Sequence, residues 1–218
     1  MALASEVDIC NAALAHLGDS AQVASINPPD STAQSRWCSR FYPIARDALL
    51  ERHNWGFTLR RATLLRLDAD TTAWRYAYSP PPGVLNYLAV TDATATDDLA
   101  VPMVGLSIPQ QSVYAPQPFV VEALDTGQPV LYTNQLNAVL RYTVKVTDTS
   151  QYNPLFVVAL ELFLASYLAG PLIKGTEGRQ VGAQMRAEAK TALMEAAASD
   201  ANQGRVQPVP AVPWIAGR

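Results

Sequence analysis

Apolar residues recur at helical spacing through the first 53 residues of the chain. A first helix should begin at the N-cap Ser5, with Asp8 in a capping-box position, and should end at Gly18. A second helix should end at about His53. Pro43 lies inside this second pattern and lacks a backbone N–H, so it predicts either a kink or two shorter helices.

Two further helices are predicted near the C-terminus. One begins after Asn153–Pro154, is apolar on most of its circumference and ends at Gly170–Pro171, which is typical of a central core helix. The other runs from about Thr176 to Ala201 with an alanine-rich apolar stripe, which suits close helix packing. Residues 204–218 are rich in proline and should be extended.

The middle of the chain shows the alternating pattern of β-strands. The clearest segment is 138–146, and further short strands are predicted at 74–78, 84–90, 101–104, 119–123 and 130–133. The fold class is therefore α+β: a bundle of four main helices with an inserted, small antiparallel β-rich domain. The expected division is 1–74 and 150–203 for the helical domain, 75–149 for the β-rich domain and 204–218 for an extended C-terminal arm.

Composition narrows the possible partners. Charged residues make up 16% of the chain, against about 25% in an average protein. The net charge of −3 excludes a basic protein that grips nucleic acid through general charge. A surface this poor in charge suggests that part of it is covered by partners. The acidic groups concentrate in residues 76–150, which carry two basic and six acidic side chains.

No combination of residues predicts an enzyme. The glycine-rich nucleotide loops, the zinc-protease motif and the nucleophile elbow are absent from the sequence. His16 and His53 lie on different predicted helices and are interpreted as structural. Asp92, Asp97 and Asp98 could bind a hard cation, but their spacing matches no EF-hand loop. We therefore expect no catalytic residue, no metal site and no cofactor.

Cys10 and Cys38 are too few for a disulfide framework or a four-ligand zinc site. Both lie in helical patterns and are interpreted as buried free thiols in a reducing compartment. The first residues lack the basic and apolar segments of a signal peptide. No membrane span is expected either, because polar residues and a Gly-Pro pair interrupt the most apolar run.

Several blocks of sequence resemble one known family. The blocks are Glu6–Leu14 followed by Leu17–Gly18, Cys38–Leu50, His53–Phe57, Arg61–Ala62, Tyr76–Tyr78, Tyr142, Asp148, Asn153–Phe156 and Ala159–Leu160. Their order and spacing over residues 5–195 resemble the tail tubular protein A family of short-tailed bacteriophages. No single block is a catalytic signature.

This resemblance implies a structural virion protein without catalytic activity. Members of the family are head-to-tail adaptors that form a ring, typically a dodecamer, beneath the capsid portal. They carry the tail nozzle and tail fibres and surround a channel through which double-stranded DNA passes. The protein would then be made in the cytoplasm of the bacterial host and would reside in the virion tail.

The resemblance also suggests where contacts lie. A conduit should not bind DNA tightly, so Asp92, Asp97 and Asp98 are expected to face the DNA channel or the nozzle. The C-terminal arm matches no motif of the family, and it could clasp a neighbouring subunit or the portal. Its expected contact residues are Pro208, Pro210, Pro213, Trp214, Ile215 and Arg218.

Two other functions remain open at this point. The chain could be a small hydrolase that uses Cys38 or its acidic residues, or a helical scaffold protein with a partner outside any phage. The basic clusters at Arg60–Arg61 with Arg66 and at 174–179 are interpreted as solvated, although one of them could face passing DNA.

Overall fold

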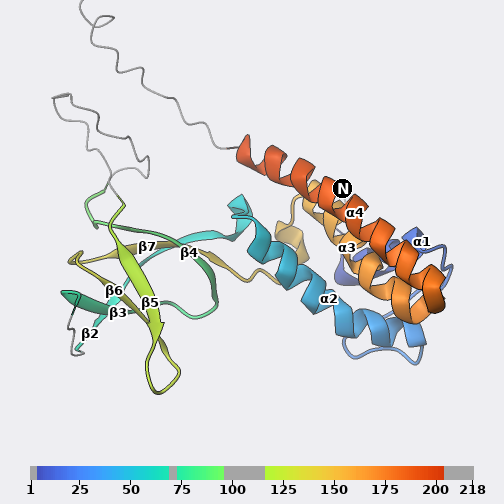
Figure 1. Ribbon diagram of the computed structural model, residues 1–218, viewed down its shortest axis with the longest axis horizontal. Helices are drawn as coiled ribbons and strands as arrows, with labels where there is room; N and C mark the ends of the chain where they lie inside the picture. The colour runs from blue at the N-terminus through green and yellow to red at the C-terminus, as the bar shows by residue number, and fades with distance from the viewer. Residues whose placement is uncertain (1–3, 69–72, 96–115, 204–218) are drawn as a thin grey trace, which may run out of the picture.

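The computed structural model describes residues 4–68, 73–95 and 116–203, which form a helical region and a β-sheet region side by side (Figure 1). The helices are α1 (Glu6–His16), α2 (Ala33–Arg52), α3 (Pro154–Ile173) and α4 (Gly175–Ala201). The strands are β1 (Leu59–Thr63), β2 (Leu65–Leu67), β3 (Tyr76–Ser79), β4 (Val84–Thr91), β5 (Phe119–Ala123), β6 (Pro129–Thr133) and β7 (Val139–Val144). The predicted α+β class is therefore confirmed.

The helix starts follow the capping signals in the sequence. Ser5 and Asp8 form a complete capping box: the Ser5 backbone N–H donates to Asp8 Oδ2 over 2.9 Å, and the Asp8 N–H donates to Ser5 Oγ over 3.2 Å. Thr32 caps α2 by accepting the N–H of Ser35.

Proline does not interrupt the helices where the sequence suggested. α2 continues through Pro43, so the prediction of two shorter helices is wrong. Tyr42 and Leu49 are fully buried on this helix. Their burial offsets the cost of about 3 kcal/mol for an interior proline. α3 likewise continues past Gly170–Pro171 to Ile173.

α3 lies at the centre of the helical region. Nine of its residues are buried, and it packs against α1, α2 and α4. Its length and composition would also allow α3 to cross a membrane, and half of its most apolar 18-residue stretch is buried inside the protein. A core helix surrounded by other helices has the same apolar composition.

α3 and α4 are antiparallel and approach each other closely (Figure 1). A Cβ atom added to Gly178 would lie 2.8 Å from the carbonyl oxygen of Ala169, and one added to Gly182 would lie 3.1 Å from that of Ser166. The turn between the helices places Lys174 and Gly175 at positive φ values of 64° and 62°. The glycines therefore permit a separation that any larger residue would prevent.

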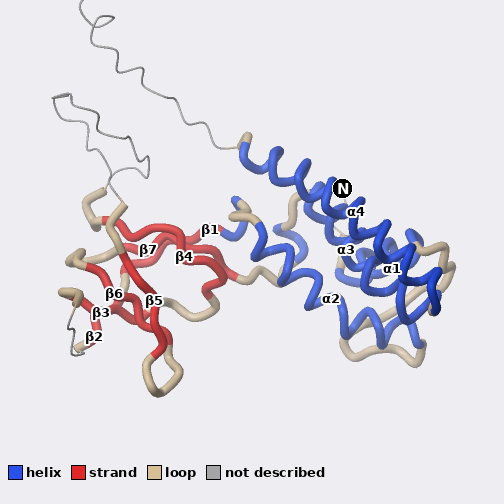
Figure 2. Tube along the Cα trace, in the orientation of Figure 1, coloured by secondary structure: helices blue, strands red, loops and turns tan. Residues whose placement is uncertain are grey.

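The strands form two antiparallel sheets with the orders β1-β7-β4 and β2-β3-β6-β5 (Figure 2). Leu64 joins them, since it lies between β1 and β2 and donates its N–H to the Ala138 carbonyl over 2.9 Å. Residues from both sheets share one apolar cluster, which includes Tyr78, Leu131 and Leu140. The two sheets therefore enclose a second core, separate from that of the helices.

The sheet region begins earlier in the sequence than expected. β1 pairs with β7 and β2 pairs with β3, so 59–67 belongs to the sheets although it was expected in the helical part. Both strands are short and largely exposed, and arginines occupy positions 60, 61 and 66. The alternation of apolar and polar residues that marks a strand is therefore not visible in this segment. β5, β6 and β7 lie where the pattern predicts strands. The predicted strand at 101–104 falls outside the described residues.

Replacement of Gly178 by alanine should destabilise the helical region. The new methyl group would meet a backbone carbonyl, so the two helices must separate, at a cost of about 1–3 kcal/mol. The matched control is Gly170→Ala, whose Cβ would meet nothing within 4 Å. That substitution should be neutral or should stabilise the protein by up to about 1 kcal/mol. Urea denaturation measures both, and equal effects of the two substitutions would contradict the close-packing argument.

Candidate interaction surfaces

A buried carboxylate joins the two regions of the molecule. Asp200, in the last turn of α4, is 8% exposed. Its Oδ2 accepts the backbone N–H of Gly56 over 2.9 Å, and its Oδ1 accepts the side-chain amide of Asn153 over 3.0 Å. His53 Nε2 lies 3.3 Å from Oδ2. Gly56 lies on the passage from α2 to β1, and Asn153 is the N-cap of α3 after the return from β7, so Asp200 ties both passages to the end of α4.

Aromatic rings pack around the same joint. Trp55 is fully buried and donates its indole N–H to the Leu49 carbonyl over 3.0 Å. Its ring centroid lies 4.7 Å from that of His53 and 4.9 Å from that of Phe156, in edge contacts. Phe57 lies 5.3 Å from Phe156. Because His53 is held between a ring and a carboxylate, its geometry agrees with the structural role expected for it.

A chain of charges links α1, α2 and the segment just after β7. Arg46 on α2 is 6% exposed, donates to Asp47 Oδ1 over 2.8 Å and lies 3.8 Å from Glu6 of α1. Lys145, just after β7, pairs with the other oxygen of Asp47. Asp47 therefore connects the helical region to the sheet region at a second point.

The two cysteines are free and buried, as predicted. Both are fully inaccessible in the core between α1 and α2. A hydrogen bond with Cys38, reinforced by burial, raises the pKa of the Cys10 thiol. Since Cys38 has no exposed surface, a substrate could not reach it without local opening of the helical core.

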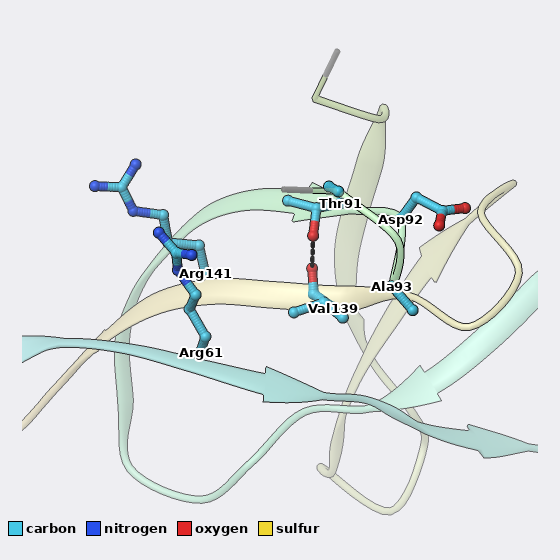
Figure 3. Close-up of a pocket in the computed structure, with 7 residues that line it drawn as sticks. Arg61, Thr91, Asp92, Ala93, Val139 and Arg141 are labelled. Carbon is cyan, nitrogen blue, oxygen red and sulfur yellow. Dashed lines mark hydrogen bonds between the residues drawn. The ribbon is translucent and has the colours of Figure 1, made fainter. Parts of the chain in front are cut away.

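The outer face of the three-stranded sheet carries two arginines side by side (Figure 3). Arg61 of β1 and Arg141 of β7 are direct partners across the strands. Leu140 and Tyr142 are buried in the inner cluster, so alternation directs Arg141 to the opposite face. A small cavity of about 80 Å³ lies beside the arginines and is also lined by Val139, Ala93 and Ala95. Pockets for drug-sized ligands usually measure about 300–1,000 Å³, so this one suits a single side chain.

Asp92 borders the same cavity at the end of β4, with its carboxylate turned away from the two arginines (Figure 3). Oδ1 accepts both the backbone N–H and the hydroxyl of Thr94, each over 2.7 Å, and Oδ2 accepts the side-chain amide of Gln135. The hydrogen bond from the Thr94 hydroxyl is the main cause that lowers the pKa of Asp92. Asp92 is therefore an exposed carboxyl group whose charged form is stabilised by its neighbours.

A second hollow lies over the seam of α3 and α4. Its floor consists of Gly178 and Gly182, and Tyr167 and Arg186 stand at its side. The Arg186 guanidinium lies 5.3 Å from the centroid of the Tyr167 ring. The small residues that allow close helix packing thus also leave an open groove.

His16, interpreted as structural, lies among the described residues, whereas the other residues expected at partner contacts do not. His16 lies 3.8 Å from Glu161, whose pKa is raised by burial, and this pair sits at the end of α1. Asp97 and Asp98, together with the arm residues Pro208, Pro210, Pro213, Trp214, Ile215 and Arg218, lie outside the described residues. Within residues 4–68, 73–95 and 116–203, no group of three His, Cys, Asp or Glu side chains could hold a metal ion.

Asp200, which has the most hydrogen-bond partners at the joint, was not predicted as a site residue from the sequence. One signal was present, because acidic residues are unfavourable in the last turn of a helix. An acid at that position suggests a tertiary partner. Nothing local indicated which residues those partners are.

Comparison with known proteins adds no family assignment. No protein-family model matches the chain, and no curated protein matches it significantly.

Substitution of Asp200 by alanine should loosen the joint. It leaves the Gly56 N–H and the Asn153 amide without their acceptor, so the free energy of unfolding should fall by about 2–4 kcal/mol. Hydrogen exchange should also accelerate at Gly56. Ser199→Ala, at the exposed neighbouring position, is the control and should change neither quantity. Unchanged protection at Gly56 in Asp200→Ala would contradict the role given to this carboxylate.

Substitution of Thr94 by valine should raise the pKa of Asp92 toward its ordinary value, because the strongest donor to the carboxylate is lost. A carboxyl group with a lowered pKa contributes stability above its unfolded-state pKa, and this contribution disappears as the pH falls through the folded-state pKa. In the variant, the stabilising contribution of Asp92 should therefore disappear at a higher pH than in the wild type. Carboxyl NMR titration measures the shift, with Thr63→Val as control. An unchanged Asp92 titration would contradict the assignment.

Proposed function

We propose that this protein is a head-to-tail adaptor of a short-tailed bacteriophage: a structural subunit that forms a ring between the capsid portal and the tail nozzle, around the channel for exiting DNA. It has no catalytic role in this proposal, and its partners are further copies of itself, the portal protein, the nozzle protein and possible tail fibres. It resides in the virion tail.

The observation that carries the proposal is that four of the resembling sequence blocks meet in the core of the helical region. The first block contributes Cys10, which contacts Cys38 of the second block. The second also contributes Leu49, which accepts the indole N–H of Trp55 in the third. Trp55 in turn packs against Phe156 of the block Asn153–Phe156. A set of matching residues that forms one continuous core is the part of a sequence that specifies a fold.

The surface also supports assembly. Large apolar side chains are exposed on both regions, at Ile44, Leu155, Val158 and Met194 of the helices and at Leu65, Leu124 and Leu136 of the sheet region. A ring requires two different, complementary surfaces on each subunit. Exposed apolar groups on opposite parts of an elongated subunit meet that requirement. A single apolar patch would instead favour a two-fold dimer.

The charge of the chain fits a conduit. Each phosphate that a protein neutralises adds affinity through counterion release, so a passage for DNA should avoid a strongly basic lining. A net charge of −3 for each subunit gives the assembled ring an acidic character. In this proposal Asp92, Asp97 and Asp98 face the channel or the nozzle.

The C-terminal arm is assigned to a neighbouring subunit or the portal. It follows α4 directly after the Asp200 joint, so a contact made by 204–218 would act on the point where the two regions meet. Trp214 and Ile215 are the apolar residues proposed to anchor it.

Purified protein should form ring-shaped particles when mixed with its phage's portal protein. Electron microscopy shows the particles, and analytical ultracentrifugation gives the number of subunits. A chain without residues 205–218 should remain folded by circular dichroism yet assemble more weakly, because the arm's contacts are lost.

Other outcomes would identify a different protein. A chain that stays monomeric at every concentration, with and without portal, would refute the adaptor and leave a scaffold with another partner. A hydrolytic activity lost in Cys38→Ala, in a variant that keeps its fold, would favour the enzyme. Assembly unaffected by removal of 205–218 would refute the role of the arm alone.

A further inference from the structure

We propose that the outer face of the three-stranded sheet, around Arg61 and Arg141, binds the acidic β5–β6 hairpin of a second copy of this chain. The proposal rests on the ring assembly proposed above and names one of its contacts. The receptor is the arginine face, defined as Arg61, Arg141 and the adjoining cavity. The ligand is the hairpin tip, defined as Glu122, Leu124 and Asp125.

The arginine face is built to receive an anion. Arg61 and Arg141 are directly opposed across neighbouring strands, so their side chains leave the same face of the sheet. Two guanidinium groups side by side can bind one carboxylate together. Each guanidinium has five N–H donors in a planar fork, so it can bind an incoming carboxylate in addition to contacts within its own chain.

The hairpin tip has the complementary properties. Glu122 and Asp125 are exposed, and within the described residues neither carboxylate forms an ion pair or hydrogen bond. Leu124 between them is 37% exposed. A tight turn shapes the tip, since the Leu124 N–H donates to the Gln128 carbonyl over 2.9 Å and Gly127 donates back to Leu124 over 2.7 Å. Two carboxylates therefore flank one apolar side chain on a rigid turn.

Shape supports the pairing as well as charge. The cavity beside Arg141 measures about 80 Å³ and has apolar walls from Val139, Ala93 and Ala95. This space suits the end of an aliphatic side chain such as that of Leu124. With the leucine seated there, the carboxylates on either side of it come within reach of the two arginines.

The hairpin belongs to a second copy because it cannot reach the arginines of its own subunit. Figure 1 shows the β5–β6 turn projecting from the end of the sheet region that lies away from β4 and β7. The arginines stand on the outer face of the sheet that contains those strands. A contact between two different surfaces of identical chains is heterologous, and it closes into a ring if the rotation allows.

Charge reversal on either side of this contact should weaken assembly. Arg61→Glu and Asp125→Lys change exposed positions only. Each should raise the concentration of protein at half-assembly by about tenfold or more, because a repulsive pair replaces an attractive one. The double variant Arg61→Glu/Asp125→Lys restores opposite charges at every contact and should return to within about threefold of the wild-type concentration. Sedimentation velocity measures these concentrations.

Arg75→Glu and Glu195→Lys make the same changes of charge at other exposed positions and serve as controls. They should assemble as the wild type does. A double variant no better than its weaker parent would overturn the proposal, and so would single variants that match their controls.

Two further outcomes distinguish this contact from the ring assembly as a whole and from DNA binding by the arginines. Wild-type rings that tolerate both reversals would overturn the arginine-face contact and leave the adaptor intact, whereas a wild type that never associates would overturn both. If Arg61→Glu leaves assembly unchanged but weakens binding of a fluorescent DNA duplex, the arginines contact phosphate, and the hairpin contact is refuted.

Discussion

The position of one carboxylate determines how the two regions of this protein are held together. Asp200 is almost fully buried and accepts hydrogen bonds from both segments that connect helices to sheets. A buried charge is costly unless it is fully hydrogen-bonded, so its partners cannot move away without a large penalty. Trp55 and Phe156 are both fully buried and pack edge-on against each other. Each lies close in the sequence to a residue that contacts Asp200, since Trp55 directly precedes Gly56 and Phe156 follows shortly after Asn153.

The close packing of α3 and α4 gives that joint a rigid support. Asp200 lies near the end of α4, and Gly178 lies near its beginning against Ala169 of α3. The two points hold α4 along most of its length. The sheet region, attached at the Asp200 end and again through Asp47 and Lys145, therefore presents its outer face and its β5–β6 hairpin in a defined direction relative to the helices. A subunit of a closed ring needs this kind of fixed geometry, because small errors of angle accumulate around the ring.

The parts of the fold that follow from local signals could be predicted. The Ser5–Asp8 capping box, the apolar circumference of α3 and the alternation of β7 all depend on residues within one or two turns of each other. The sequence left open whether Pro43 lies in one helix or separates two, because burial of Tyr42 and Leu49 against other elements outweighs the local cost of proline. β1 and β2 were missed for a related reason: they are stabilised by pairing with β7 and β3, which lie far away in the sequence.

The same division holds for the candidate surfaces. The sequence alone determined the four helices, most of the strands, the burial of Cys10 and Cys38, the acidic middle of the chain and the blocks that resemble a phage adaptor. Only the tertiary structure placed Arg61 opposite Arg141 and Asp200 against Gly56 and Asn153. Periodicity and capping act between near neighbours, so a sequence displays them directly. Strand register and buried hydrogen-bond clusters join residues that lie far apart in the sequence: Asp200 is 47 positions from Asn153 and 144 positions from Gly56. Only the folded chain selects such partners.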